Sequence, residues 1–379
     1  MDLIWNVSLI CPWDCEFCCT DAVHVRKLAG SVVLRESGLS NRRIIPMGRY
    51  EPEHLRQLGI KLNAYDYALI DRQERGLELD FNSKVNVLNN VRERTPEIDF
   101  AGGDPLACLE NYLLIKKAAE MFGKENVSVT STGHSLARYP LEELAKHIGT
   151  FEFTYDEPDS CGVEVRPKGY NAINILWAGR MHALGVKTKC QIPLHSNNIS
   201  TEGIREIYQR LTDSKIDEVL LMRTFPVGRG LNFLKNKPVD LQSADYMAAI
   251  SEFKSLEYRK GGPKVRVQCA LKHLFSEEHA ANPCDLMQSS FGINSKGQLL
   301  LSAWATNPVG LPLAEEFILG DLSKQSIDEI ENTERFVRYK ARLNENFGHC
   351  KIFAYLNSDI KSENSIFMRT DPLFANRNN

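Results

Sequence analysis

The chain of 379 residues has no apolar run approaching the roughly 20 residues that a bilayer-spanning helix needs. Its N-terminus lacks the basic region followed by a long apolar stretch that marks a secretory signal peptide. It has no excess of positive charge either, since 46 lysines and arginines face 49 aspartates and glutamates. A nucleic-acid surface would show a basic face. We therefore expect a cytoplasmic protein without membrane or nucleic-acid partners.

The ten cysteines are assigned to metal ligands and buried thiols, because a reducing compartment does not sustain a disulfide framework. Cys11, Cys15 and Cys18 stand at C-x3-C-x2-C spacing directly after the first hydrophobic run. Three thiolates in so short a loop can hold three irons of a 4Fe-4S cluster and leave the fourth iron open to an external ligand. A structural zinc loop is the alternative, but no second ligand pair follows promptly. Cys19 is expected to be a packed thiol.

Short β-rich runs alternate with helical patterns as far as about residue 262, which predicts repeated βα units and a parallel sheet. Helical spacing of apolar residues predicts helices over residues 109–122 and 170–184. Parallel α/β folds build their sites at the carboxyl ends of the strands, where the cysteine loop falls. The predicted strands cover residues 3–10, 97–101, 126–131, 150–155, 187–194 and 218–225.

Two regions lie outside this alternation. Residues 25–76 form an arginine-rich insertion, interpreted either as a substrate-facing lid or partner-docking arm, or as a solvated surface excursion. Gly261-Gly262-Pro263 breaks the last helix, and beyond it residues 291–301 are typical of a β-hairpin. The polar C-terminal tail is expected to be poorly ordered. The predicted division is residues 1–262, an accessory domain over 263–356, and the tail over 357–379.

The cysteine motif resembles that of the radical SAM (S-adenosylmethionine) superfamily. The resemblance implies an α/β protein with a partial (β/α)6 barrel and a small C-terminal α+β accessory domain. It also implies that a 4Fe-4S cluster on Cys11, Cys15 and Cys18 binds S-adenosylmethionine, cleaves it reductively and generates a 5′-deoxyadenosyl radical that abstracts hydrogen from a substrate. The electron would come from a reducing partner such as flavodoxin or ferredoxin.

The same resemblance implies which residues hold S-adenosylmethionine. Phe17 stands where the family places a residue against the adenine. A family motif Gly-Gly-Glu-Pro, which binds the methionyl amino group, is matched here by Gly102, Gly103, Asp104 and Pro105, with a shorter acid. Thr154 and Arg166 are similar to the hydroxyl and arginine that bind the methionyl carboxylate, and a surface arginine is the alternative for Arg166. Further strand-end candidates for the ribose and adenine are Ser131, Thr132, Gln191 and Met222.

Residues 269–350 resemble, more loosely, the SPASM/twitch accessory module, which usually holds additional iron-sulfur clusters. The hairpin normally runs into Pro-Cys, but this chain has Leu301-Ser302, so one expected ligand is missing. Cys269, Cys284 and Cys350 remain as ligands for one auxiliary cluster, and a degenerate domain without metal is the alternative. We favour the cluster slightly, because Cys350 between His349 and Lys351 reads as part of a polar turn.

Together these features predict a radical SAM enzyme, an oxidoreductase or isomerase, that modifies an unactivated C–H position of a ribosomally made precursor peptide by crosslinking, epimerisation or oxidation. One alternative is an epimerase or dehydrogenase acting on a small aminoglycoside or sugar-nucleotide intermediate. Another is a noncatalytic iron-sulfur scaffold, which would predict a damaged cysteine triad or a damaged 102–105 motif, and both are intact. An epimerase needs a thiol hydrogen donor, for which Cys108, Cys161 and Cys190 are candidates, with a buried thiol as the alternative for each.

Overall fold

The computed structural model describes residues 1–379 except 49–50, 58, 159–165, 233–240, 275–281 and 375–379. Its main sheet has the strand order β11-β10-β9-β8-β7-β6-β1-β12-β13-β14, and all neighbours from β11 to β12 are parallel. The predicted α/β class is confirmed, and each predicted strand overlaps an observed one. The parallel strands are β1 (Asp2–Ser8), β6 (Glu97–Gly102), β7 (Val127–Thr130), β8 (Thr150–Thr154), β9 (Lys187–Leu194), β10 (Glu218–Arg223) and β11 (Lys264–Val267).

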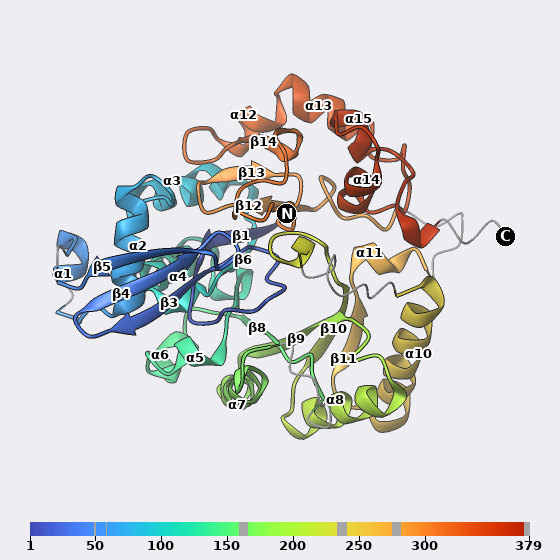
Figure 1. The fold of residues 1–379 in the computed structure, drawn as a ribbon, viewed down its shortest axis with the longest axis horizontal. Coiled ribbons are helices and arrows are strands. Elements are labelled where there is room, and N and C mark those ends of the chain that lie inside the picture. Colours follow the sequence, from blue (N-terminus) through green and yellow to red (C-terminus); the bar gives the residue numbers. More distant parts are fainter. Residues whose placement is uncertain (49–50, 58, 159–165, 233–240, 275–281, 375–379) are drawn as a thin grey trace.

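Amphipathic helices cover this sheet. In α8 (Thr201–Asp213), Ile204, Ile207, Tyr208 and Leu211 recur at helical spacing and are all buried. Figure 1 shows α7, α8 and α10 along the outside of the parallel strands. The other helices of this part are α3 (Phe81–Val91), α4 (Leu109–Phe122), α5 (Gly133–Leu136), α6 (Leu141–Leu144), α7 (Tyr170–Ala183), α10 (Ser243–Lys260) and α11 (Cys269–Lys272).

The insertion after the cysteine loop is a folded β-meander. A second sheet has the order β2-β3-β4-β5, and α2 (Ala64–Glu74) packs against it. Val32, Leu34 and Ile45 join Ala68 and Leu69 in its apolar core. The insertion is therefore structured, while a lid or docking role stays a prediction. Its other elements are β2 (Ile10–Cys11), β3 (Val23–Leu28), β4 (Ser31–Glu36), β5 (Asn41–Pro46) and α1 (Glu53–Arg56).

The chain after β11 extends the main sheet. β12 (Ser290–Ile293) pairs in parallel with β1, and β13 (Gln298–Leu300) and β14 (Ile318–Asp321) follow antiparallel, which confirms the predicted hairpin. This addition pairs the edge that β1 would otherwise expose. Because the sheet runs across residue 263, the division into domains stays a prediction.

The C-terminal segment packs onto the fold as far as it is described. Ile366, Phe367 and Leu373 are buried, and Asp371 accepts hydrogen bonds from Arg223 at 2.8 Å. The expected disorder is therefore wrong for residues 357–374. The segment is mostly polar, but Ile366, Phe367 and Leu373 are buried and hold it against the fold. None of the helices in the described part of the chain is long and apolar enough to cross a membrane. The last helices are α12 (Ile327–Glu331), α13 (Glu334–Ala341), α14 (Lys351–Asn357) and α15 (Glu363–Ile366).

Candidate functional site

The cysteine motif lies in a loop whose two ends are joined by strand pairing. β2 ends at Cys11 and pairs with β3, which places Cys11 opposite His24. Within the loop, the Trp13 amide donates to Cys11 Sγ at 3.5 Å and the Ala22 amide donates to Cys18 Sγ at 3.4 Å. Amide donors directed at sulfur stabilise the thiolate, which is the form that binds metal.

The three cysteines line one large cavity that extends along the inward faces of the parallel strands. Its volume is about 820 Å³, and every strand from β1 to β11 of the parallel set contributes to its wall. Among the described residues, no three His, Cys, Asp or Glu side chains are already arranged to hold a metal ion. The fit to an iron-sulfur cluster rests on the all-sulfur donor set, the amide bonds to two of the sulfurs and the shared cavity.

The charges around the triad are uneven. Burial raises the pKa of the Cys11 thiol, and the carboxylate of Asp104 raises it further. Burial also raises the pKa of Cys15, although the Arg166 guanidinium opposes this change. At Cys18 the effect of burial is outweighed by the positive charge of Arg229 and by hydrogen bonds, so its pKa is lowered. Within the triad, Cys18 is therefore the thiolate that the protein stabilises most.

The Gly-Gly-Asp-Pro motif closes β6 against the start of the cysteine loop. The Gly103 amide donates to the Ser8 carbonyl and the Asp104 amide to the Ile10 carbonyl, both at 2.7 Å. A Cβ on Gly102 would lie 2.2 Å from the Ser8 carbonyl oxygen, and one on Gly103 would lie 2.4 Å from that of Ile10. Both positions therefore require glycine, because the two backbones meet there.

Asp104 is fully buried, and its carboxylate accepts hydrogen bonds from other residues of the chain. The hydroxyls of Ser131, Thr132 and Ser135 donate to it, each at 2.6 Å, and the Leu106 amide donates at 3.2 Å. Burial raises the pKa of Asp104, and these hydrogen bonds partly oppose that rise. In this geometry Asp104 does not present the free carboxylate expected for the methionyl amino group, and the hydroxyls of Ser131 and Thr132 are engaged with it. Asp104 joins β6 to the end of β7.

Arg166 lies beside the cysteine loop and is not the surface arginine of the alternative interpretation, since its side chain is only 10% exposed. Its Nε and Nη2 donate to Asp156 at 2.6 to 3.2 Å, and its guanidinium carbon lies 4.2 Å from the centre of the Phe17 ring. Pro105 is buried beside Asp104. The cofactor candidates that line the cavity are Phe17, Gly102, Gly103, Ser131, Thr132, Thr154, Arg166, Gln191 and Met222, and their contacts with S-adenosylmethionine stay predictions.

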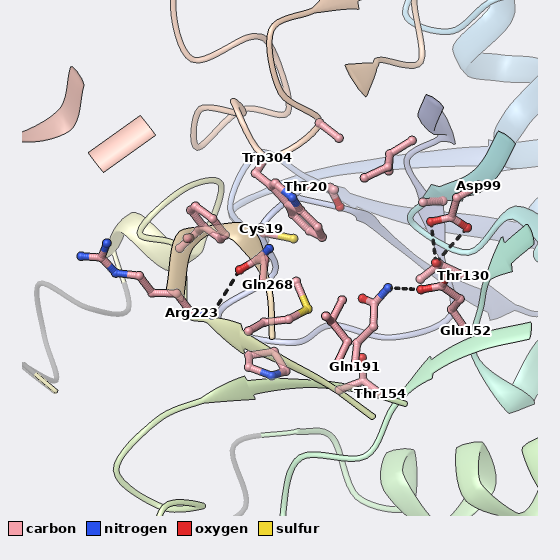
Figure 2. Close-up of a pocket in the computed structure, with 18 of the residues that line it drawn as sticks. Cys19, Thr20, Asp99, Thr130, Glu152, Thr154, Gln191, Arg223, Gln268 and Trp304 are labelled. Atoms are coloured by element: carbon pink, nitrogen blue, oxygen red, sulfur yellow. Dashed lines mark hydrogen bonds between the residues drawn. The ribbon is translucent and has the colours of Figure 1, made fainter. Parts of the chain in front are cut away.

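A polar cluster on the inward faces of β6 to β9 was not predicted. Figure 2 shows Thr130 bonded to Asp99 and Gln191 bonded to Glu152 in the wall of the cavity. Lys189 Nζ also donates to Glu152, at 2.9 Å. Burial, and then the charge of Glu152, raise the pKa of Asp99 to about 7. The available signal was the alternation of polar residues along the predicted strands, which places these side chains on one face.

The three C-terminal cysteines gather at the same cavity. Cys269, Cys284 and Cys350 all line it, together with Ser302. Burial raises the pKa of Cys269, and the nearby thiols of Cys284 and Cys350 raise it further. Cys350 is buried and precedes α14, so the expected polar turn is wrong. The three thiols share one cavity, but among the described residues they are not arranged as a metal-ligand set, so the auxiliary cluster stays a prediction.

The candidate hydrogen donors are placed unequally. Cys108 and Cys190 are fully buried, and neither is among the described residues that line the cavity. Cys161 lies outside the described residues. Cys19 packs against the hydrophobic core, as expected of a packed thiol, and it also lines the cavity (Figure 2). A substrate in the cavity would therefore meet Cys19 rather than Cys108 or Cys190.

The structure is an α/β fold with a large parallel sheet and a three-cysteine loop beside the first strand of that sheet. No protein-family model and no curated protein matches the sequence. The structure is similar to that of Streptococcus suis SuiB bound to S-adenosylmethionine, with a TM-score of 0.56, 15% identity, and coverage of 93% of this chain and 73% of that chain.

Two further solved structures contain peptides. SuiB bound to precursor peptide SuiA gives a TM-score of 0.54 at 16% identity, covering 90% of this chain and 66% of that chain. The protein anSMEcpe with bound AdoMet and Cp18Cys peptide gives 0.53 at 13% identity, covering 97% and 93%. At such identities the likeness shows the fold alone, and it confirms the α/β fold with a large parallel sheet that we expected.

Proposed function

We propose that this chain is a radical SAM enzyme that modifies a peptide. The observation that carries the proposal is the opening of Cys11, Cys15 and Cys18 onto one cavity of about 820 Å³. Small-molecule sites typically measure about 300 to 1,000 Å³, so this volume suits a nucleoside-sized cofactor together with part of a substrate. The likeness to proteins solved with S-adenosylmethionine and with peptides supports both parts of the proposal.

The cysteine triad would hold the 4Fe-4S cluster, and Cys269, Cys284 and Cys350 would hold an auxiliary one. When bound, the first cluster supplies the electron that cleaves S-adenosylmethionine. Arg166 then offers a guanidinium beside the cluster loop for the methionyl carboxylate, and Asp156 fixes its orientation. Phe17, stacked on the same guanidinium, gives an apolar face for the adenine.

The cluster of Asp99, Glu152 and Lys189 suits an oxidative reaction. After a hydrogen atom is lost from a C–H bond of the substrate, loss of an electron leaves a proton to be removed. An auxiliary cluster held by Cys269, Cys284 and Cys350 would supply the acceptor for that electron. Asp99, with a pKa raised to about 7, can take up that proton at neutral pH from within the cavity. These acidic residues therefore favour peptide crosslinking or oxidation. Epimerisation would instead need a thiol that donates a hydrogen atom, such as Cys19.

The test is binding of S-adenosylmethionine to the anaerobically reconstituted protein. Cys15→Ser should abolish binding, because it removes an iron ligand from the loop. Cys108→Ser is the matched control, since that thiol is buried outside the cavity lining and should leave binding intact. A precursor peptide encoded by a gene next to that of this protein should then change in mass when the enzyme turns over. Binding that survives loss of Cys15 would contradict the proposed cofactor, and turnover of aminoglycosides but not peptides would contradict the substrate class.

A further inference from the structure

Arg229 is buried beneath the cysteine loop, with 4% of its surface exposed. Its Nε donates to the Cys15 carbonyl at 3.0 Å, and its Nη1 donates to the Ala22 carbonyl at 2.7 Å and to Asp21 at 3.1 Å. Its backbone amide donates to the Cys18 carbonyl at 2.9 Å. Arg229 therefore contacts the loop at four points between Cys15 and Ala22.

The last guanidinium nitrogen, Nη2, is buried and has no hydrogen-bond partner among the described residues. Burial lowers the pKa of Arg229, but the negative charges of Cys18, Asp21, Cys15 and Cys11 together raise it. The guanidinium thus lies within electrostatic reach of all three cysteines of the triad.

The backbone before Arg229 is shaped to bring this side chain to the loop. Gly228 has φ +54°, and a Cβ there would lie 2.5 Å from the Cys19 carbonyl oxygen and 2.6 Å from that of Cys18. Only a glycine permits such an approach at this backbone angle. The Gly228 amide is held by the Thr306 carbonyl at 2.8 Å, so the segment after β10 is fixed from its other side as well.

We propose that Arg229 is a positioning residue that sets the reduction potential of the cluster held by Cys11, Cys15 and Cys18, a role that rests on the proposed function. One-electron reduction adds one negative charge to a cluster that is already held by three negatively charged thiolates. A fixed positive charge against the loop favours the added electron, because net charge and hydrogen bonding are among the factors that set cluster potentials. Asp21 partly offsets this effect through its ion pair with Arg229.

The proposal predicts potential shifts of opposite sign for two variants at one ion pair. Arg229→Gln should make reduction at least tenfold less favourable, a shift of about 59 mV to more negative potential for one electron. Arg229→Lys keeps the charge and should restore at least half of that difference. Asp21→Asn removes the opposing negative charge at nearly constant shape, and it should move the potential in the positive direction.

The measurement is an EPR-monitored titration of the full chain, reconstituted anaerobically and reduced with dithionite, following the signal that Cys15→Ala removes. Arg138→Gln is the control, because Arg138 pairs with Asp66 and with the Ala107 carbonyl, not with the cysteine loop, and its loss should leave the potential unchanged. Iron content is measured in every variant, so that loss of the cluster is not mistaken for a change in potential.

Equal potentials in the wild type and in iron-loaded Arg229→Gln would overturn the proposal. Equal potential shifts in Arg229→Gln and Arg229→Lys would overturn it too, because they would show that the charge of Arg229 has no effect and that its role is only structural. If Arg229→Gln fails to bind iron, Asp21→Asn decides alone: a positive shift supports the proposal, and a zero or negative shift refutes it. A wild-type protein that binds no cluster would instead refute the proposed function, and this inference with it.

Discussion

Replacing Asp104 with alanine should destabilise the protein before any ligand is added. The Asp104 carboxylate accepts hydrogen bonds from Ser131, Thr132 and Ser135 and from the Leu106 amide. The three hydroxyl residues are only 5 to 6% exposed, so water cannot readily replace the lost acceptor. The variant would leave several buried donors without a partner at the junction of β6 and β7.

The size of the effect follows from these contacts. A hydrogen bond to a charged group contributes about 1.5 to 3 kcal/mol, and a buried donor left unsatisfied is costly. If two of the four bonds find no substitute, the free energy of unfolding falls by about 3 to 6 kcal/mol. That is a large fraction of the roughly 5 to 15 kcal/mol that stabilises a typical protein.

Urea denaturation of the apoprotein measures this loss as a lower transition midpoint at an unchanged slope. Asp14→Ala is a suitable control, because the Asp14 carboxylate on the cysteine loop is 35% exposed and should contribute about 1 kcal/mol or less. The reasoning is refuted if Asp104→Ala costs less than about 1 kcal/mol while weakening S-adenosylmethionine binding tenfold or more. The carboxylate would then serve the ligand, as the sequence motif alone predicts.

Two further predictions concern the cavity wall and the metal content. The folded-state pKa of Asp99 is raised to about 7, so its stabilising contribution is present below its unfolded pKa near 3.8 and is lost as the pH rises through 7. Asp99→Asn should therefore gain stability relative to the wild type as the pH rises from about 4 to about 7, reaching about 2 kcal/mol after allowance for solvent in the cavity. A difference in denaturation midpoints that does not change with pH would contradict this sign. Reconstituted wild type should carry about eight irons per chain and the Cys11/Cys15/Cys18 triple alanine variant about four. A wild-type count near four that vanishes in the triple variant would show that Cys269, Cys284 and Cys350 hold no cluster.

The parts of the fold that could be predicted are those encoded over short stretches. The cysteine motif carries its chemistry within one loop, and in strands such as Lys187–Leu194 buried residues alternate with less buried ones. β11 was missed because Lys264 and Arg266 make it look like a surface segment, and only its pairing with β10 identifies it.

The parts that could not be predicted depend on contacts distant in sequence. The hydroxyl partners of Asp104 lie 27 to 31 residues away, and no spacing rule connects a carboxylate to them. Arg229 meets Cys15 across 214 residues of chain. The inward cluster around Asp99 needs the register of four neighbouring strands, which the sequence does not contain in any one segment.

Release of 5′-deoxyadenosine from S-adenosylmethionine by the anaerobically reconstituted protein with dithionite tests the central claim most directly. We predict release by the wild type and by Cys108→Ala, whose thiol lies outside the cavity lining. We predict none from Cys11→Ala, Cys15→Ala or Cys18→Ala, since each removes one of the three iron ligands. Full release in any of these three variants, or no release from a wild-type protein loaded with iron and S-adenosylmethionine, would contradict the account.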